Sequence, residues 1–133
     1  MFDPVRVKAL LEADRYANAM GISLVSVTDH EIVIEMEVGG HHLNFLDVGH
    51  GGMLFSIADC AFSLASNSAG DRAVAIDTHL VLTAATREGD VLTATAREEV
   101  RGRTLGTYRV AVTRQDGRVA GLFTGTVHIT PAS

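Results

Sequence analysis

The sequence predicts a single α+β domain over residues 1–133, in which one curved antiparallel sheet wraps around a long buried helix. Two observations carry this prediction. Residues 51–67 are helical in pattern and apolar around most of the circumference, which is typical of a buried helix. The second half of the chain is a series of strand-like segments joined by short turns, so neighbouring strands are expected to pair antiparallel.

The first element is expected to be a helix over residues 3–20. Asp3 suits its N-cap, Pro4 suits its first turn and Gly21 suits its end. We expect this helix to cover another element and assign no chemistry to it. The expected strands are residues 22–28, 31–38, 73–83, 91–100, 104–113 and 119–130.

Between the second strand and the central helix lies a fourteen-residue loop, residues 39–52, with the sequence GGHHLNFLDVGHGG. Loops of this length inside compact domains are usually functional or disordered. Three of the six histidines of the chain lie in it. We therefore expect the loop and the start of the helix to carry the function.

Composition excludes several classes of protein. The formal net charge is -5, so the chain lacks the basic surface that nonspecific nucleic-acid binding needs. The least charged stretch, residues 48–70, contains glycines, serines and the central Asp59, which argues against a membrane span. A single cysteine, Cys60, and an N-terminus without the apolar segment of a signal peptide predict a cytoplasmic protein.

Two features of the helix point to chemistry. The His50-Gly51-Gly52 start offers unpaired N–H groups that can bind a phosphate or stabilise an oxyanion. A glycine-rich start without a ligand is the alternative. Asp59 lies on the narrow polar arc of the helix, where it is either a general base with a raised pKa or a solvated or paired carboxylate. The serines expected on the same arc are Ser56, Ser63 and Ser66.

Other candidates carry weaker signals. His41 and His42 have no third ligand at a recognisable metal spacing, so no metal site is expected. Cys60 has the apolar neighbours of a core residue. Arg101 and Arg103 lie two residues apart around a hairpin turn, where they can form the rim of a pocket for a phosphorylated ligand.

Taken together, these motifs resemble the signature of hotdog-fold acyl-CoA thioesterases of the phenylacetate-degradation (PaaI-like) type. The similar segments are residues 42–44 (HLN) and residues 50–59 (HGGMLFSIAD), in which the Asp follows the first glycine by eight residues. Similarity continues through residues 76–83, 101–104 and 125–126. In the hotdog fold the sheet wraps the long helix, as the expected element order requires.

The resemblance implies roles for individual residues. The N–H of Gly51 would polarise the thioester carbonyl, and Asp59 would activate water or attack directly. Asn44 would help to place water or substrate, and His50 would shape the loop and the thioester pocket. The turn over residues 100–105 would flank coenzyme A. Residues assigned to binding of substrate or coenzyme A are Gly52, Leu82, Arg101, Gly102, Arg103 and Thr104.

Three positions depart from the pattern of the family. Asp47 stands where relatives usually have glycine, which is expected to alter the loop and to add a carboxylate near the site. Ala75 replaces a hydroxyl residue that helps to orient water in some relatives, and Ala84-Ala85 replaces a common Arg-Pro. The first two bear on rate and substrate choice more than on reaction type.

The expected function is therefore hydrolysis of an acyl-coenzyme A thioester, with no cofactor beyond the coenzyme A of the substrate. The alternative is a domain of the same fold that binds or senses acyl-coenzyme A without catalysis. Gly51 and Asp59 are roughly 12 Å apart along one helix, too far to act on one thioester. We therefore expect a homodimer with shared sites, and the resemblance implies a dimer of dimers.

Overall fold

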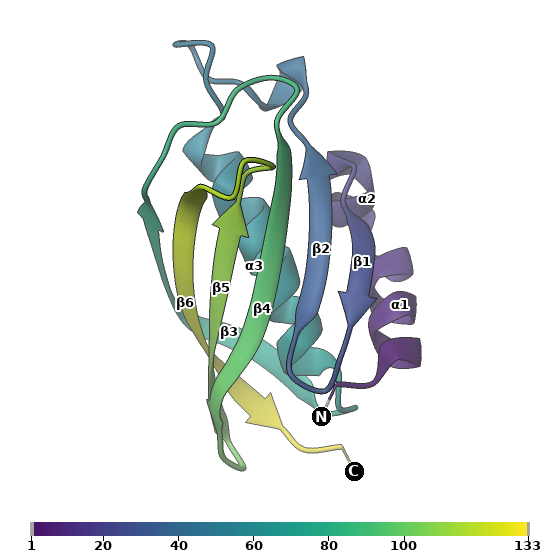
Figure 1. Cartoon of the computed structure of the whole chain (residues 1–133). Coiled ribbons are helices and arrows are strands. Elements are labelled where there is room, and N and C mark those ends of the chain that lie inside the picture. Colours follow the sequence, from purple (N-terminus) through teal and green to yellow (C-terminus); the bar gives the residue numbers. More distant parts are fainter. Residues whose placement is uncertain (1, 133) are drawn as a thin grey trace.

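The computed structural model describes residues 2–132 and contains one six-stranded antiparallel sheet that curves around a long helix, α3 (Figure 1). The strand order is β1-β2-β4-β5-β6-β3. This is the arrangement expected from the sequence. The elements are α1 (Pro4–Ala13), α2 (Arg15–Met20), β1 (Ser23–Val27), β2 (Ile32–Glu37), a 3-10 turn (Gly40–His42), α3 (Gly51–Asn67), β3 (Arg72–Leu82), β4 (Val91–Arg101), β5 (Leu105–Thr113) and β6 (Val119–Thr130).

The core lies between α3 and the concave face of the sheet. Apolar residues of β2, β4, β5 and β6 alternate between buried and exposed positions, and the buried set faces α3. The ring of Phe62 on α3 packs against Phe123 and Tyr108, with centroids 5.3 and 5.9 Å apart. All three side chains are almost completely buried, so the second half of α3 is fixed against the sheet at this point.

The N-terminal segment is two helices, so the expectation of one helix over residues 3–20 is wrong. Asp14 takes an extended conformation between α1 and α2, and its Oδ1 accepts a hydrogen bond from the N–H of Ala17 at 2.9 Å. The side chain of Asp14 thus caps a new helix instead of continuing the first, as short polar side chains tend to do. Gly21 ends α2 in the left-handed region, with φ of 82°.

Strand β3 forms one edge of the sheet and is exposed along almost its whole length. Its exposed residues include several large apolar ones. These are Val74, Ile76, Val81 and Leu82. An open, apolar edge strand is a surface on which another strand can pair. Across residues 2–132, no helix is both long enough and apolar enough to cross a membrane.

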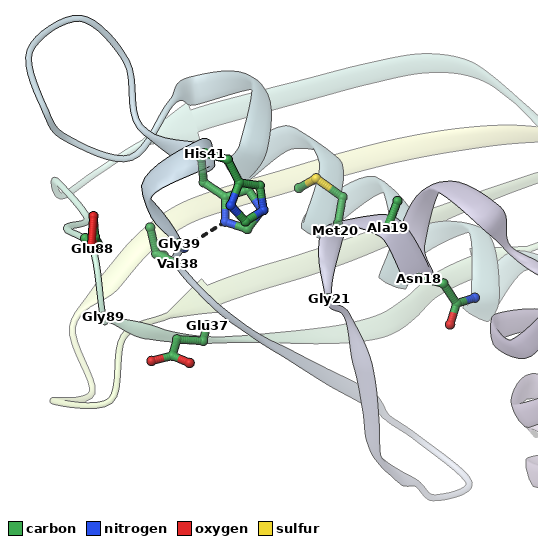
Figure 2. Close-up of a pocket in the computed structure, with 11 residues that line it drawn as sticks. Asn18, Ala19, Met20, Gly21, Glu37, Val38, Gly39, His41, Glu88 and Gly89 are labelled. Carbon is green, nitrogen blue, oxygen red and sulfur yellow. Dashed lines mark hydrogen bonds between the residues drawn. The ribbon is translucent and has the colours of Figure 1, made fainter.

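The long loop before α3 is anchored at its base by His42. This side chain is buried, and its Nδ1 accepts a hydrogen bond from the N–H of Gly39 at 2.9 Å. Figure 2 draws this bond as the dashed line at Gly39, beside the labelled His41. The carbonyl of His42 accepts from the N–H of His50 at 2.8 Å, and Leu43 pairs with Gly49 as an isolated bridge. The imidazole of His42 therefore holds the loop segment that leads into α3.

Acid should weaken this anchor. Burial lowers the pKa of His42 from its usual value of 6.5, and the charge of the neighbouring His41 lowers it further. The neutral ring is therefore favoured in the fold, and the stability that it contributes is present above about pH 6.5 and is lost as pH falls through the lowered pKa. His42→Asn retains an oxygen that can accept the Gly39 bond but does not titrate. Urea unfolding between pH 8 and pH 5 should show a steeper loss of stability in the wild type than in the variant. Equal pH dependence in both proteins would show that His42 does not anchor the loop in this way.

Candidate functional site

The start of α3 presents one unpaired backbone donor. His50 is the N-cap residue, and its Nδ1 accepts a hydrogen bond from the N–H of Gly52 at 2.8 Å. The carbonyl of His50 accepts from Met53, the next residue in the first turn, at 3.0 Å. Among residues 2–132, no hydrogen bond uses the N–H of Gly51. His50 thus accepts the hydrogen bonds of the N–H groups of Gly52 and Met53. The Gly51 N–H, at the positive end of the helix, stays available for an acceptor.

Close packing explains two of the glycines. A Cβ on Gly49 would lie 1.9 Å from Oγ1 of Thr86, and a Cβ on Gly52 would lie 3.0 Å from Nδ1 of His50. A side chain at Gly49 would displace the segment that holds Thr86. A side chain at Gly52 would crowd the capping ring of His50.

A cavity of about 300 Å³ lies beside this helix start. Leu82, predicted to contact substrate, lines it together with Gly51. The rest of its wall could not be predicted as a pocket from the sequence, because a run of small residues after a strand has no distinctive motif. The further lining residues are Gly49, Leu54, Thr83, Ala84, Ala85 and Thr86.

Asp59 lies on α3 two turns after Gly51. Its side chain is half-buried and makes no hydrogen bond or ion pair within the described part of the chain. Ser56 and Ser63 share this accessible face of the helix. Ser66, which was expected on the same arc, is instead buried, and its hydroxyl donates to the carbonyl of Ser63 at 3.3 Å.

Burial raises the pKa of Asp59 above its usual value, and the negative charge of Asp14 raises it further. A carboxylate with a raised pKa accepts a proton from water more readily than an ordinary one. Burial and the same two carboxylates raise the pKa of the Cys60 thiol to about 12. Cys60 is thus a core thiol, because a thiol with that pKa is almost never a thiolate at neutral pH.

Asn44 holds the tip of the loop and keeps its amide nitrogen free. Its Oδ1 accepts hydrogen bonds from the N–H groups of Leu46 at 2.9 Å and Val48 at 3.3 Å. These two donors identify the oxygen of the side-chain amide and direct the Nδ2 group to the other side. Within residues 2–132, Nδ2 has no partner. The side chain can therefore donate to a bound molecule but has little capacity left to accept.

The backbone of Asp47 takes a conformation that glycine also adopts. Its φ is 60°, in the left-handed region that glycine favours. Most L-residues lose roughly 1–2 kcal/mol there, and Asp loses less. The expectation that Asp47 alters the loop stays a prediction, although its backbone takes a conformation that glycine also adopts. The residue adds an exposed carboxylate next to the exposed Phe45 and Leu46.

The hairpin between β4 and β5 separates its two arginines. The side chain of Arg101 is only 18% exposed, and its Nη1 donates to the carbonyl of Ser66 at 3.0 Å and to the hydroxyl of Tyr108 at 2.6 Å. Arg101 thus holds the C-terminal end of α3 and does not form a pocket rim. Arg103 is exposed in the turn and has no ion pair within the described residues. Gly102 closes the turn through its N–H to Leu105, and Thr104 is exposed beside it.

One protomer does not bring the predicted residues together. Arg101 marks the C-terminal end of α3 and Gly51 its N-terminal end, which for this helix is roughly 22 Å away. Gly51 and Leu82 line one cavity, and His50 and Gly52 belong to the same helix start. Asn44 lies in the loop before this helix start, and the hairpin residues lie apart from both. Asp59 lies between the helix start and the hairpin. Among the described residues, no three His, Cys, Asp or Glu side chains are grouped to hold a metal ion.

Comparisons with known proteins agree with this architecture. Residues 47–120 match the model of the thioesterase superfamily. A putative esterase of Deinococcus radiodurans is 41% identical over 117 residues, which are 87% of this chain and 80% of that protein. The acyl-coenzyme A thioesterase PaaI of Escherichia coli is 38% identical over 120 residues, which are 90% of this chain and 86% of that protein.

Solved structures give the same answer. The structure of Escherichia coli PaaI superposes with a TM-score of 0.92 and 35% identity, covering 97% of this chain and 94% of that one. A Streptococcus mutans protein, solved bound to acetyl CoA, superposes with a TM-score of 0.79 and 28% identity over 83% of this chain and 89% of that one. The chain belongs to the thioesterase superfamily, as a PaaI-like thioester hydrolase with the hotdog fold.

Proposed function

We propose that the protein hydrolyses an acyl-coenzyme A thioester to the free carboxylic acid and coenzyme A. The observation that carries the proposal is that α3 presents two groups without a partner among residues 2–132, the N–H of Gly51 and the carboxylate of Asp59. One is a donor suited to a developing oxyanion, and the other is a base suited to water. The relatives support the choice of substrate, because one is named an acyl-coenzyme A thioesterase and another was solved with acetyl CoA.

In the proposed reaction, a water oxygen attacks the thioester carbonyl carbon while Asp59 takes one of its protons. The carbonyl oxygen becomes negative and is stabilised by the Gly51 N–H and the positive end of α3. The C–S bond then breaks, and the coenzyme A thiolate leaves and takes up the proton. Direct attack by Asp59 would form an anhydride first, which water then cleaves. The raised pKa of Asp59 suits its role as the base that takes this proton.

Asn44 has a narrower role in this proposal than the resemblance alone implied. Since its Oδ1 is occupied by the loop backbone, only Nδ2 is free to act on the substrate or on water. Asn44 therefore acts as a donor, either to the thioester oxygen or to the oxygen of the attacking water. His50 acts through the cap that orients Gly51 and Gly52.

The first prediction concerns Asp59. Asp59→Asn should lower thiol release from acyl-coenzyme A by about 10²–10⁴-fold, because the base is lost while the shape is kept. In the wild type, kcat/KM should fall as pH drops through the raised pKa of Asp59, since only the ionised carboxylate accepts a proton. Free thiol, followed with a thiol-reactive dye, measures both effects.

Two outcomes would contradict this prediction. Equal rates for the wild type and Asp59→Asn would remove Asp59 from the mechanism. Binding of acyl-coenzyme A with a rise in melting temperature, but without thiol release above background, would identify the chain as a binding or sensing domain instead.

We also propose that each site is shared between two chains. Gly51 and Asp59 are roughly 12 Å apart along one α3, whereas reacting atoms must come within about 3–3.5 Å. Two antiparallel α3 helices at a twofold axis would place the Gly51 of one beside the Asp59 of the other. The open apolar edge of β3 offers the strand pairing that such a dimer needs.

Subunit exchange tests the shared site. Asn44→Ala and Asp59→Ala homodimers should each be inactive. After exchange, every mixed dimer contains one site with both residues intact and one with neither. Activity should therefore appear on mixing and approach half the wild-type value per mixed dimer. If exchange is confirmed and both variants are folded, an inactive mixture would overturn the shared-site proposal.

Arg103 is the proposed contact for the phosphates of coenzyme A. It is the exposed arginine of the hairpin, whereas Arg101 is occupied by Ser66 and Tyr108. In the proposed dimer, this hairpin belongs to the same chain as the catalytic Asp59. The thioester would then lie near Asp59 while the phosphates extend toward the C-terminal end of α3.

Replacing the two arginines separately should separate their roles. Arg103→Ala should raise KM about two- to fivefold at low salt, as expected for an exposed ion pair, and the effect should fade as salt rises. Arg101→Ala should instead lower the melting temperature, because it leaves the Ser66 carbonyl and the Tyr108 hydroxyl short of a donor, at about 1–3 kcal/mol. An unchanged KM in Arg103→Ala at low salt would exclude the phosphate contact.

A further inference from the structure

Tyr16, on α2, is an exposed aromatic residue whose hydroxyl is fixed on α3. The residue is 62% exposed, yet its hydroxyl oxygen lies 2.7 Å from Oγ of Ser56. Ser56 donates its own hydrogen to the carbonyl of Gly52 at 2.8 Å. Tyr16 must therefore be the donor to Ser56. This directional chain holds the exposed ring in one orientation.

The Tyr16 hydroxyl is anchored about one turn of α3 from the proposed catalytic carboxylate. Ser56 lies three residues before Asp59, so the two side chains share one face of α3, with Cβ atoms about 5–6 Å apart. The segment itself packs there, because α2 contacts α3. Asp14, which caps α2 two residues before Tyr16, raises the pKa of the Asp59 carboxyl through its charge. The start of α2 therefore borders the place where the acyl carbonyl would react.

We propose that Tyr16 is a specificity-determining residue, whose ring forms one wall of the space for the acyl group and limits the length of acyl chain that fits. The proposal rests on the thioesterase function proposed above. The reacting carbonyl must lie within a few ångströms of Asp59 or its water, so an acyl chain of several carbons extends past the adjoining turn of α3. The Tyr16 ring stands beside that turn. Because its hydroxyl is bonded to Ser56, the ring cannot swing aside without losing that bond.

The experiment compares kcat/KM for straight-chain acyl-coenzyme A substrates from acetyl to octanoyl. Tyr16→Ala should raise the octanoyl-to-acetyl ratio of kcat/KM about tenfold or more, a change typical of altered steric fit in an apolar pocket. Tyr16→Phe and Ser56→Ala should shift the ratio in the same direction but less, because the ring remains and only its anchor is lost. The double variant Tyr16→Phe/Ser56→Ala should shift it no further than the larger single change.

Val5→Ala is a matched control, because Val5 is also an exposed apolar residue of the N-terminal helices and makes no hydrogen bond through its side chain. It should leave the ratio unchanged. Circular dichroism and melting temperature check that each variant is folded. A uniform change of kcat/KM across all chain lengths in Tyr16→Ala, or no change, would overturn the proposal.

This outcome is distinguishable from failure of the proposed function. If the wild type releases no thiol from any substrate, the thioesterase function fails, and the same panel is then measured by calorimetry. Tyr16→Ala should in that case shift the octanoyl-to-acetyl ratio of dissociation constants in favour of octanoyl. A ratio equal to that of the wild type would overturn the role of Tyr16.

Discussion

The site depends on a difference in hydrogen bonding between the two ends of the buried helix α3. At the C-terminal end of α3, Arg6 donates to the carbonyl of Asn67 at 2.7 Å and Arg101 donates to that of Ser66, so the negative end of the helix is neutralised. At the other end, His50 caps Gly52, and no group in the described part of the chain accepts from the N–H of Gly51. The helix is therefore fixed where it ends and open to a ligand where it begins.

Much of this could be predicted from local patterns. Alternation of apolar and polar residues identified the strands, and the apolar circumference of residues 51–67 identified α3, because both periods are properties of short segments. The break between α1 and α2 at Asp14 could not be predicted in this way. An aspartate is acceptable inside a helix and better as a cap, so the sequence alone does not decide between the two. The orientation of the Arg101 side chain could not be predicted either. Its partners, Ser66 and Tyr108, become its neighbours only when the hairpin packs across the end of α3.

The candidate site shows the same division between local and long-range information. The helix start and Asp59 were identifiable because a motif of ten residues contains both. The occupied oxygen of Asn44, the wall of small residues after β3 and the position of Tyr16 against Ser56 depend on contacts between segments far apart in the chain. Such contacts carry no signature in a single sequence, because many residue types satisfy them.

A shared site gives the bond from Tyr16 a second consequence. The chain of donors runs from Tyr16 through Ser56 to the carbonyl of Gly52. Ser56 lies one turn from the Asp59 of one site, whereas Gly52 adjoins the Gly51 that would serve the other site of the dimer. In such a dimer, one chain of hydrogen bonds would therefore join the proposed wall of one site to the helix start that serves the other.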